Sequence, residues 1–532
     1  MNLSYYEFYA EKMKYKTSLL AILSGLLLAI PWTYSVFFFT IFFAYIPLLI
    51  LEEESHNQEN PYWLFNYTFL AFLVWNSLSY WWVSEAEFIG SIFIILINSA
   101  IQATVFWLIS KARKQLKISI LFPFLIIGLG FEYFHTQWDL AWPWLNLGNA
   151  FAAQPKLVQW YEYTGVRGGS LWLILTNIAL FSLFKKRNIR NLTGVLLLFI
   201  IPISSSLYLY SQEEMPVSNK SFSLIQPNLD PYTDKFNPEN EEKHLEEFFS
   251  TADSILQKQE FDLIFGPETM ILQAINEEFP SESKAYNQLL ALKRNYPKTE
   301  FFIGVHSFQK LGEVIPPGSR YNEEDDYYFE AFNTALFLDQ DNKTQFYHKT
   351  RLVPLFERMP FVQHLSFLGK YSLELGGYKG TYSDRNTTNT FSASDSSSII
   401  PIVCFESIFS DYCAQRVSET PGFICMITND GWWKNSLGYR YHFDFSRLRA
   451  IENRRQIVRV ANNGISALIN EKGEIESQTQ WWEKAILNGE VKLFTRKTFY
   501  STHGDYIGRI TAFFAILLLI FVKIRRITQS KH

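Results

Sequence analysis

Cysteine is scarce in this chain, which has three in 532 residues, at Cys404, Cys413 and Cys425. A disulfide framework normally uses an even number of cysteines spread along the chain, so we expect none, although Cys413 and Cys425 could still pair. The nine histidines are scattered, and none stands in the His-Glu-x-x-His motif of many zinc enzymes. We therefore expect no metal site and no cofactor.

Charged residues are also scarce over much of the chain. They are nearly absent from long tracts before about Tyr210 and common from there to about Arg496. The formal net charge of −4 argues against a nucleic-acid partner, because proteins that bind nucleic acids usually have basic surfaces. The chain therefore combines a charge-poor part with a charge-rich part.

Long apolar runs occupy the charge-poor part before about Tyr210, and one more lies near the C-terminus. A bilayer core of about 30 Å needs about 20 mostly apolar residues per helix. Candidate runs are Ser18–Trp32, Tyr34–Leu51, Tyr62–Val83, Ile89–Ile109, Ile118–Phe134, Ser170–Phe184, Leu192–Tyr210 and Ile510–Val522. We expect a multi-spanning α-helical membrane protein with about eight transmembrane helices. Seven of them belong to an N-terminal membrane domain, residues 1–211, and the last to a C-terminal helix and tail, residues 508–532.

Lysine and arginine in short loops predict the orientation of such a protein. Basic residues precede the first run and follow the fourth, sixth and last, at Lys12, Lys14, Lys16, Lys111, Arg113, Lys114, Lys117, Lys185, Lys186, Arg187, Arg190, Lys523, Arg525 and Arg526. With eight spans they all lie on one side. We therefore expect both termini in the cytoplasm and the segment between the last two spans outside the cytoplasmic membrane.

That exported segment, residues 218–496, alternates strand-like and helix-like patterns. Strand-like runs include Ser221–Gln226 and Phe423–Thr428, while Glu239–Gln259 and Arg447–Arg459 are predicted to be helices. The alternation is typical of an α/β domain.

Three residues with reactive side chains each follow an apolar strand-like run in this segment. They are Glu268, Lys349 and Cys404. Taken singly, they read as a capping acid, a solvated charge and a core thiol. Because α/β folds place active sites at strand ends, we expect them to meet in one site.

Together these residues supply the parts of a nucleophilic mechanism. A thiol with a pKa of about 8.5 becomes a nucleophile when a base removes its proton. A glutamate shielded in a pocket can have its pKa raised towards neutrality and act as that base. The Lys349 ammonium and the Phe405 backbone N–H can hold the oxyanion of a tetrahedral intermediate.

The motifs around these residues resemble the nitrilase superfamily, whose catalytic set is Glu, Lys and Cys in that order, and within it the apolipoprotein N-acyltransferase family. The matching pieces are Gln226-Pro227-Asn228, Pro267-Glu268-Thr269, Tyr347-His348-Lys349, Leu352-Val353-Pro354, Glu357, Cys404-Phe405-Glu406, Thr428-Asn429-Asp430-Gly431-Trp432, Arg449-Ala450-Ile451-Glu452, Arg455 and the run from Arg459 to Gly464. The resemblance implies an α-β-β-α sandwich for the exported domain, on the periplasmic side of a bacterial inner membrane.

Site roles and partners also follow from the resemblance. It implies that Glu268 is the base, Lys349 the oxyanion stabiliser and Cys404 the acylated nucleophile, with Glu357 and Glu406 as supporting acids. It further implies a membrane phospholipid as acyl donor and a diacylglyceryl-modified apolipoprotein as acceptor; we expect a monomer. The chain departs from the family's commonest pattern at Leu355-Phe356, where Phe-Gly is usual, at Arg358, where an aromatic is common, and at Phe405, where Tyr is common.

Two bulky stretches are candidates for the approach of a lipid substrate. Trp142 and Trp144 lie in a Trp-rich, Pro-interrupted segment, for which a simple aromatic belt is the alternative. Phe361, Leu365 and Phe367 lie in an apolar run between Lys349 and Cys404. Such a run is costly to expose, and packing on the domain's own core is the alternative there.

Three functions are compatible with this pattern to different degrees. The sequence favours a phospholipid-dependent N-acyltransferase with a Cys404 thioester and two successive acyl transfers. The alternative is a membrane-anchored amidase with water as acceptor, which needs one anchor rather than eight spans. A transporter or sensor with an inactive domain is disfavoured by the intact catalytic set and by the lack of charged residues well inside the spans.

Overall fold

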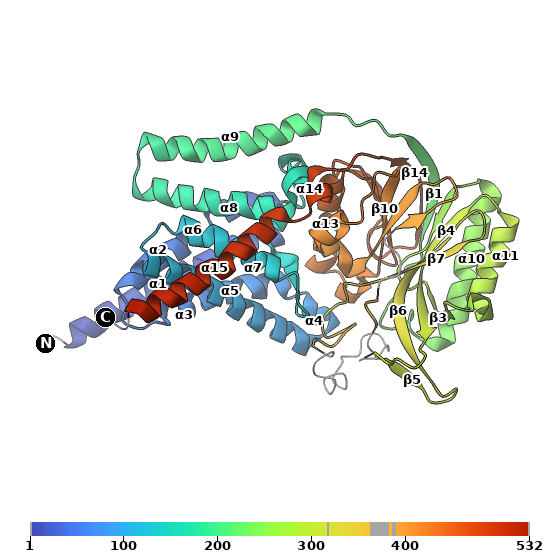
Figure 1. Cartoon of the computed structure of the whole chain (residues 1–532), viewed down its shortest axis with the longest axis horizontal. Coiled ribbons are helices and arrows are strands. Elements are labelled where there is room, and N and C mark those ends of the chain that lie inside the picture. Colours follow the sequence, from blue (N-terminus) through green and yellow to red (C-terminus); the bar gives the residue numbers. More distant parts are fainter. Residues whose placement is uncertain (1–2, 317–318, 362–381, 386–389, 530–532) are drawn as a thin grey trace. The chain divides into compact units, whose positions relative to one another are not determined.

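The computed structural model describes residues 3–316, 319–361, 382–385 and 390–529, with side chains from Tyr15 onward. The chain divides into two compact units (Figure 1). One is a helical unit, residues 1–138, 142–211 and 505–532, and the other is an α/β unit, residues 139–141 and 212–504.

The helical unit has the composition of a membrane protein. Its main helices are α1 (Leu3–Thr33), η1 (Ser35–Phe43), α2 (Ile46–Glu54), α3 (Trp63–Tyr80), α4 (Val83–Ala86), α5 (Phe88–Leu116), α6 (Leu121–Pro123), η3 (Phe124–Gly128), α7 (Leu129–Phe134), α8 (Tyr161–Lys185), α9 (Ile189–Ser211) and α15 (Tyr506–Gln529). Six helical segments of the described chain are long and apolar enough to cross a membrane, and Leu121–Phe134 is apolar but shorter. The multi-spanning helical class predicted from the sequence is confirmed, while the number of eight spans stays a prediction.

Small residues let the helices of this unit approach closely. Gly25 of α1 lies against α3, where an added Cβ would stand 2.4 Å from the Ala71 carbonyl oxygen. Gly130 of α7 lies against α15, where a Cβ would stand 3.1 Å from the Ala512 Cα. Close backbone approach increases van der Waals contact, which drives helix association in lipid because lipid tails are as apolar as the side chains. Larger residues at these two positions would force the helices apart.

A buried ionic cluster joins three helices that are remote in sequence. Arg167 of α8 donates from Nη1 to Glu132 of α7 at 2.7 Å and from Nε and Nη2 to Oδ2 of Asp505, at 3.1 and 2.9 Å. Arg167 is 5% exposed and Asp505 is 4% exposed. Charged groups this deep in a membrane protein are expensive unless they are paired. The cluster therefore ties the C-terminal helix to the rest of the helical unit.

The α/β unit is built on two sheets. The first has the strand order β14-β1-β2-β4-β6-β5, with β3 paired to β4 and β7 to β6, and the second has the order β13-β12-β11-β10-β9-β8. Their bounds are β1 (Ser218–Gln226), β2 (Leu263–Phe265), β3 (Ile271–Asn276), β4 (Glu300–Lys310), β5 (Arg320–Asn322), β6 (Tyr327–Leu338), β7 (Thr344–His348), β8 (Phe391–Ser392), β9 (Ser398–Val403), β10 (Gly422–Thr428), β11 (Ile457–Ala461), β12 (Ala467–Ile469), β13 (Ile475–Gln478) and β14 (Ala485–Leu493).

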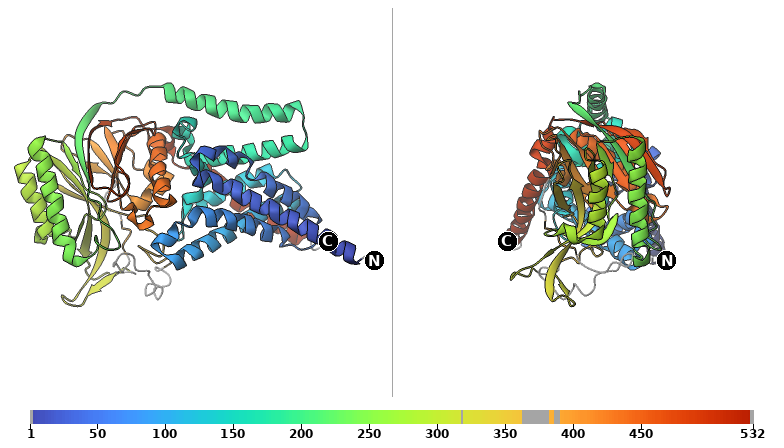
Figure 2. Two further views of the ribbon diagram at one scale, coloured as in Figure 1. Left: turned by 180° about the vertical axis from the view of Figure 1, so that it is seen from behind. Right: turned by 90° about the vertical axis from the view of Figure 1, so that its right-hand side faces the viewer.

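Helices cover the outer face of each sheet. Helices α10 (Glu241–Lys258) and α11 (Lys284–Asn295) share one apolar cluster with the first sheet, and α13 (Leu437–Asn453) lies on the far side of the second (Figures 1 and 2). The inner faces of both sheets form a second cluster, with Phe265 and Phe337 from one sheet and Val403 and Phe423 from the other. The predicted α-β-β-α sandwich is confirmed.

The helix predicted over Arg447–Arg459 is wrong at both ends. Helix α13 begins at Leu437 and ends at Asn453, because Arg454 adopts a left-handed conformation with φ 46°. The β-branched residues Ile457, Val458 and Val460 then form strand β11, as their propensity favours. The aromatic residues of the early turns are poor helix formers, and their burial in the unit overrides that preference.

Replacing Asp505 by Asn tests the ionic cluster of the helical unit. We expect Asp505→Asn to lower the free energy of unfolding by about 3 kcal/mol, because Arg167 keeps a buried charge with only Glu132 opposite it. Thermal unfolding in detergent measures the change. Glu54→Gln is the control, since the Lys16–Glu54 pair is 65% and 33% exposed and should contribute less than about 1 kcal/mol. Equal losses in both variants would contradict a special role for the buried cluster.

Candidate active site

The Cys404 thiol lies on a tight turn at the end of a buried strand. Strand β9 leads directly into the short 3-10 helix η10 (Cys404–Ile408), and Cys404 has a left-handed backbone with φ 50°. A side chain in this conformation costs roughly 1–2 kcal/mol. Ser407 Oγ donates to the Cys404 carbonyl at 2.8 Å, and the Val403 N–H donates to Glu406 at 2.9 Å. These bonds hold the nucleophile's backbone on both sides of its Cα.

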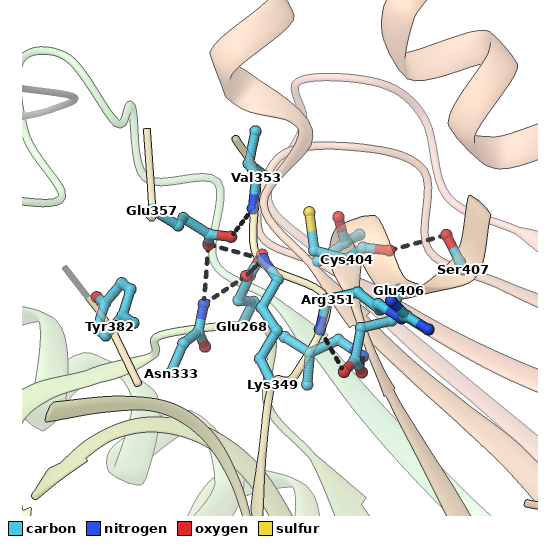
Figure 3. Close-up of polar contacts among 12 residues, drawn as sticks. Glu268, Asn333, Lys349, Arg351, Val353, Glu357, Tyr382, Cys404, Glu406 and Ser407 are labelled. Carbon is cyan, nitrogen blue, oxygen red and sulfur yellow. Dashed lines mark hydrogen bonds and ion pairs between the residues drawn. The ribbon is translucent and has the colours of Figure 1, made fainter. Parts of the chain in front are cut away.

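The ammonium of Lys349 joins two carboxylates beside this turn (Figure 3). Lys349 directly follows β7, and its Nζ lies 3.2 Å from Glu268 Oε1 and 2.7 Å from Glu357 Oε1. Glu268 follows the short strand β2 after Gly266 and Pro267. Its side chain is 5% exposed and that of Lys349 is 1% exposed. The structure thus brings together predicted site residues from separate strand ends.

The charges of this group set the protonation of each acid. Burial alone would raise the pKa of Glu268, but the Lys349 ammonium and a hydrogen bond from Asn333 lower it below the usual value. Burial and the Glu268 charge raise the pKa of Glu357, although Lys349 opposes them. The expectation of a raised pKa for Glu268 is therefore wrong, because the neighbouring cation outweighs desolvation. Glu268 is ionised at neutral pH and available as a base.

The Cys404 thiol, unlike Glu268, is in its neutral form. Burial raises the pKa of the Cys404 thiol well above its ordinary range, and the Glu268 carboxylate raises it further, while Lys349 opposes both. Cys404 is therefore a neutral thiol at rest, next to a carboxylate that can accept its proton. Nucleophilic attack by this thiol therefore requires transfer of its proton to a base.

Glu406 supports the site without reaching the reacting atoms. Besides the Val403 N–H, it accepts hydrogen bonds from the Thr350 N–H at 2.8 Å and from the Tyr347 and Tyr412 hydroxyls at 2.7 and 2.5 Å. Thr350 follows Lys349 directly in the chain. One buried carboxylate therefore connects the strand end that carries the lysine to the turn that carries the thiol.

Two further residues contact Glu268 and were not predicted from the sequence. Asn333 of β6 donates from Nδ2 to Glu268 Oε1 at 2.8 Å, and Lys235 donates from Nζ to the Glu268 backbone carbonyl at 2.8 Å. Burial lowers the pKa of Lys235 to about 7, although the Glu268 and Cys404 charges oppose this shift. Asn333 was recognisable as a polar residue within an apolar strand. Lys235 stands in a loop without periodicity, so nothing in the sequence marked it.

A cavity opens over the carboxylates of the site. Glu268, Asn333 and Glu357 line it together with aromatic side chains, which are Phe236, Phe356, Tyr382 and Trp432. Phe236 stacks on Trp432 with ring centroids 5.4 Å apart. Phe356 adds an aromatic ring to the cavity lining. The family that the sequence resembles usually has Gly at this position. The cavity is therefore lined by both carboxylates and aromatic side chains, which suits an acyl group next to a polar reacting centre.

The remaining predicted residues lie elsewhere. Trp142 and Trp144 belong to the helical unit, where they are buried, and Trp144 packs edge-on against Trp82. Phe361 is half-buried with a positive φ of 60°, whereas Leu365 and Phe367 lie outside the described residues. The Phe405 ring packs against Phe409. Their roles in substrate approach and oxyanion binding stay predictions.

The other two cysteines and the side chains that could bind a metal can be located in the structure. Cys413 and Cys425 are buried and unpaired, so the disulfide left open by the sequence is not formed. Among the residues that the structure describes, no group of three or more His, Cys, Asp or Glu side chains is placed to hold a metal ion.

Comparisons with known proteins identify relatives along nearly the whole chain. Residues 225–498 match the family model described as carbon-nitrogen hydrolase, and residues 24–179 match the model of the apolipoprotein N-acyltransferase N-terminal domain. The apolipoprotein N-acyltransferase of Chlorobaculum tepidum is 29% identical and covers 96% of this chain and 97% of its own. That of Borreliella burgdorferi is 26% identical, over 96% and 95%. A mutant of the Nesterenkonia AN1 amidase, from the nitrilase superfamily, aligns with 11% identity and a TM-score of 0.35, over 56% of this chain and 95% of its own.

The Asn333–Glu268 hydrogen bond makes a prediction about pH. Alkylation of Cys404 by iodoacetamide needs ionised Glu268, so its rate should fall with decreasing pH only below about 4.5 in the wild type, because the pKa of Glu268 is lowered. Asn333→Leu removes one cause of the lowering, and the fall should begin at higher pH. Asn333→Asp should shift it further, since it places a carboxylate opposite a carboxylate. Peptide mapping separates Cys404 from the buried Cys413 and Cys425; profiles that overlay in all three proteins would contradict the assignment.

Proposed function

The chain belongs to the carbon-nitrogen hydrolase family, and on that premise we propose that it is an apolipoprotein N-acyltransferase of the bacterial inner membrane. The single observation that carries the proposal is the pairing of ionised Glu268 and Lys349 beside the Cys404 thiol, in a chain that also has six helical segments fit to cross a membrane. The relatives that carry this name cover nearly the whole chain, including its helical part.

The first half-reaction forms a thioester. Cys404 Sγ attacks the ester carbonyl carbon of a phospholipid while the thiol proton passes to Glu268. The negative charge that develops on the carbonyl oxygen is stabilised by the Lys349 ammonium and the Phe405 N–H. The ester C–O bond then breaks, and the lysophospholipid oxygen leaves with the proton held by Glu268. The acyl chain stays on Cys404.

The second half-reaction moves the chain to an amine. The α-amino group of a diacylglyceryl-modified cysteine at the N-terminus of an apolipoprotein attacks the thioester carbonyl and gives a proton to Glu268. The C–S bond breaks, and the Cys404 thiolate takes that proton back. An amide is formed and the thiol is restored, which completes a ping-pong cycle.

The membrane part favours this reaction over hydrolysis. A membrane-anchored amidase would use the same three residues with water as the second acceptor, and needs only one anchor. Both substrates of the transferase are lipids that stay in the bilayer, so a multi-pass chain suits them. We place the α/β unit on the periplasmic side and both termini in the cytoplasm, because the loop lysines and arginines favour that orientation.

An intact-mass measurement tests the covalent step. Purified protein incubated with phospholipid should gain the mass of one acyl chain, and Cys404→Ala should gain none, since the smaller side chain fits the same space without a nucleophile. Cys413→Ala is the matched control and should gain the same mass as wild type. An adduct on Cys404→Ala, or its absence from wild type, would refute the thioester.

Charge removal at the two partners of Cys404 tests their roles. Glu268→Gln keeps the shape and removes the base, so acyl-enzyme formation should slow by about 10²-fold or more. Lys349→Met removes the charged oxyanion donor, which is worth roughly 3–4 kcal/mol. Stopped reactions with phospholipid, analysed by mass, give both rates. A wild-type rate in Glu268→Gln would mean that another group takes the thiol proton.

A further inference from the structure

The carbonyl oxygen of Cys404 is held by two buried side chains. Ser407 Oγ donates to it at 2.8 Å, and His442 Nε2 of helix α13 lies 3.0 Å from it. His442 Nε2 also lies 2.8 Å from Ser407 Oγ. His442 and Ser407 are both fully buried. The Cys404 carbonyl is thus held by His442, which lies outside the Cys404 turn and 38 positions further along the chain.

The other side of the imidazole faces a carboxylate. His442 Nδ1 lies 2.8 Å from Asp430 Oδ1, and the second oxygen of Asp430 accepts from Arg459 Nη2 at 2.7 Å. Burial opposes ionisation of Asp430, but the Arg459 charge and His442 lower its pKa far below the ordinary value. Asp430 is therefore a carboxylate, which can only accept, and it faces His442 Nδ1 together with Arg459 Nη2, which lies 3.2 Å from the same nitrogen.

The partners of His442 Nε2 indicate that this nitrogen carries a proton. The Cys404 carbonyl can only accept. Ser407 has one hydroxyl proton, and that proton is donated to the same carbonyl. If Nε2 were unprotonated, its lone pair would face the carbonyl oxygen at 3.0 Å with no hydrogen between them. A proton on Nε2 satisfies both oxygens, so the contacts favour Nε2 as a donor to the Cys404 carbonyl.

Fixing this carbonyl also fixes an N–H group. The peptide unit between Cys404 and Phe405 is planar and trans, so its N–H points opposite to its C=O. With the carbonyl directed at Ser407 and His442, the Phe405 N–H points in the opposite direction within the same peptide plane. A donor on the carbonyl also polarises the peptide unit and strengthens its N–H as a donor.

We propose that His442, bonded through Nε2 to the Cys404 carbonyl, is a positioning residue that orients the Phe405 N–H for the oxyanion. This inference rests on the proposed acyl transfer through Cys404. The left-handed backbone of Cys404 (φ 50°) is a conformation from which a non-glycine residue gains by relaxing. Ser407 and His442 oppose that relaxation, and Asp430 and Arg459 hold His442 in place.

Two reactions of the same thiol separate this role from a general loss of structure. Acyl-enzyme formation from phospholipid develops an oxyanion, whereas alkylation by iodoacetamide displaces iodide and develops none. We expect His442→Leu to slow acylation by about 10²-fold, the effect of losing one oxyanion donor, and to change the alkylation rate of Cys404 by less than about threefold. His442→Gln keeps an N–H in reach of the Cys404 carbonyl, so we expect it to restore acylation to within about tenfold of wild type.

The control is Ser446→Ala, one turn further along α13. Ser446 is buried and contacts Met426 and the His442 backbone, so this variant perturbs the same helix without touching the Cys404 carbonyl. We expect wild-type rates in both reactions. Equal losses of acylation and alkylation in His442→Leu, or no rescue in His442→Gln, would overturn the proposal. Failure of the wild type to form an acyl-enzyme would instead refute the proposed function.

Discussion

One buried ammonium organises the candidate active site. Lys349 lies between the carboxylates of Glu268 and Glu357, and two buried acids this close would otherwise share a proton, since like charges disfavour ionisation of both. The lysine keeps Glu268 ionised while Glu357 has a raised pKa. The pKa values of Glu268, Glu357 and the Cys404 thiol all depend on this one ammonium.

The sandwich fold explains how these groups meet. The glutamate and the lysine follow strands β2 and β7 of the first sheet, while the thiol follows strand β9 of the second. The inner faces of the two sheets pack through a shared apolar cluster, which fixes the distance between their strand ends. The site is therefore a property of the packed sandwich, and either sheet alone would carry only part of it.

Much of this arrangement could be predicted from the sequence, and the failures have physical causes. Apolar runs ending in Glu268, Lys349 and Cys404 marked the strand ends, because strand burial leaves a direct trace in composition. The direction of the Glu268 pKa was wrong, since it depends on a cation 81 residues away in the chain. The boundaries of α13 were wrong because its aromatic residues are helical only through tertiary packing. Lys235 and the His442 contacts arise from tertiary structure alone.

The Arg167–Asp505 pair has a consequence for biosynthesis. Its members are separated by 338 residues, and residues 212–504 of the α/β unit are made between them. At about 5–20 residues per second, the ribosome needs roughly 20–70 seconds to cover that distance. During this time the Arg167 charge has Glu132 as its partner, and the helical unit stays incomplete. Arrival of α15 would then close the helical unit only after the α/β segment has been synthesised.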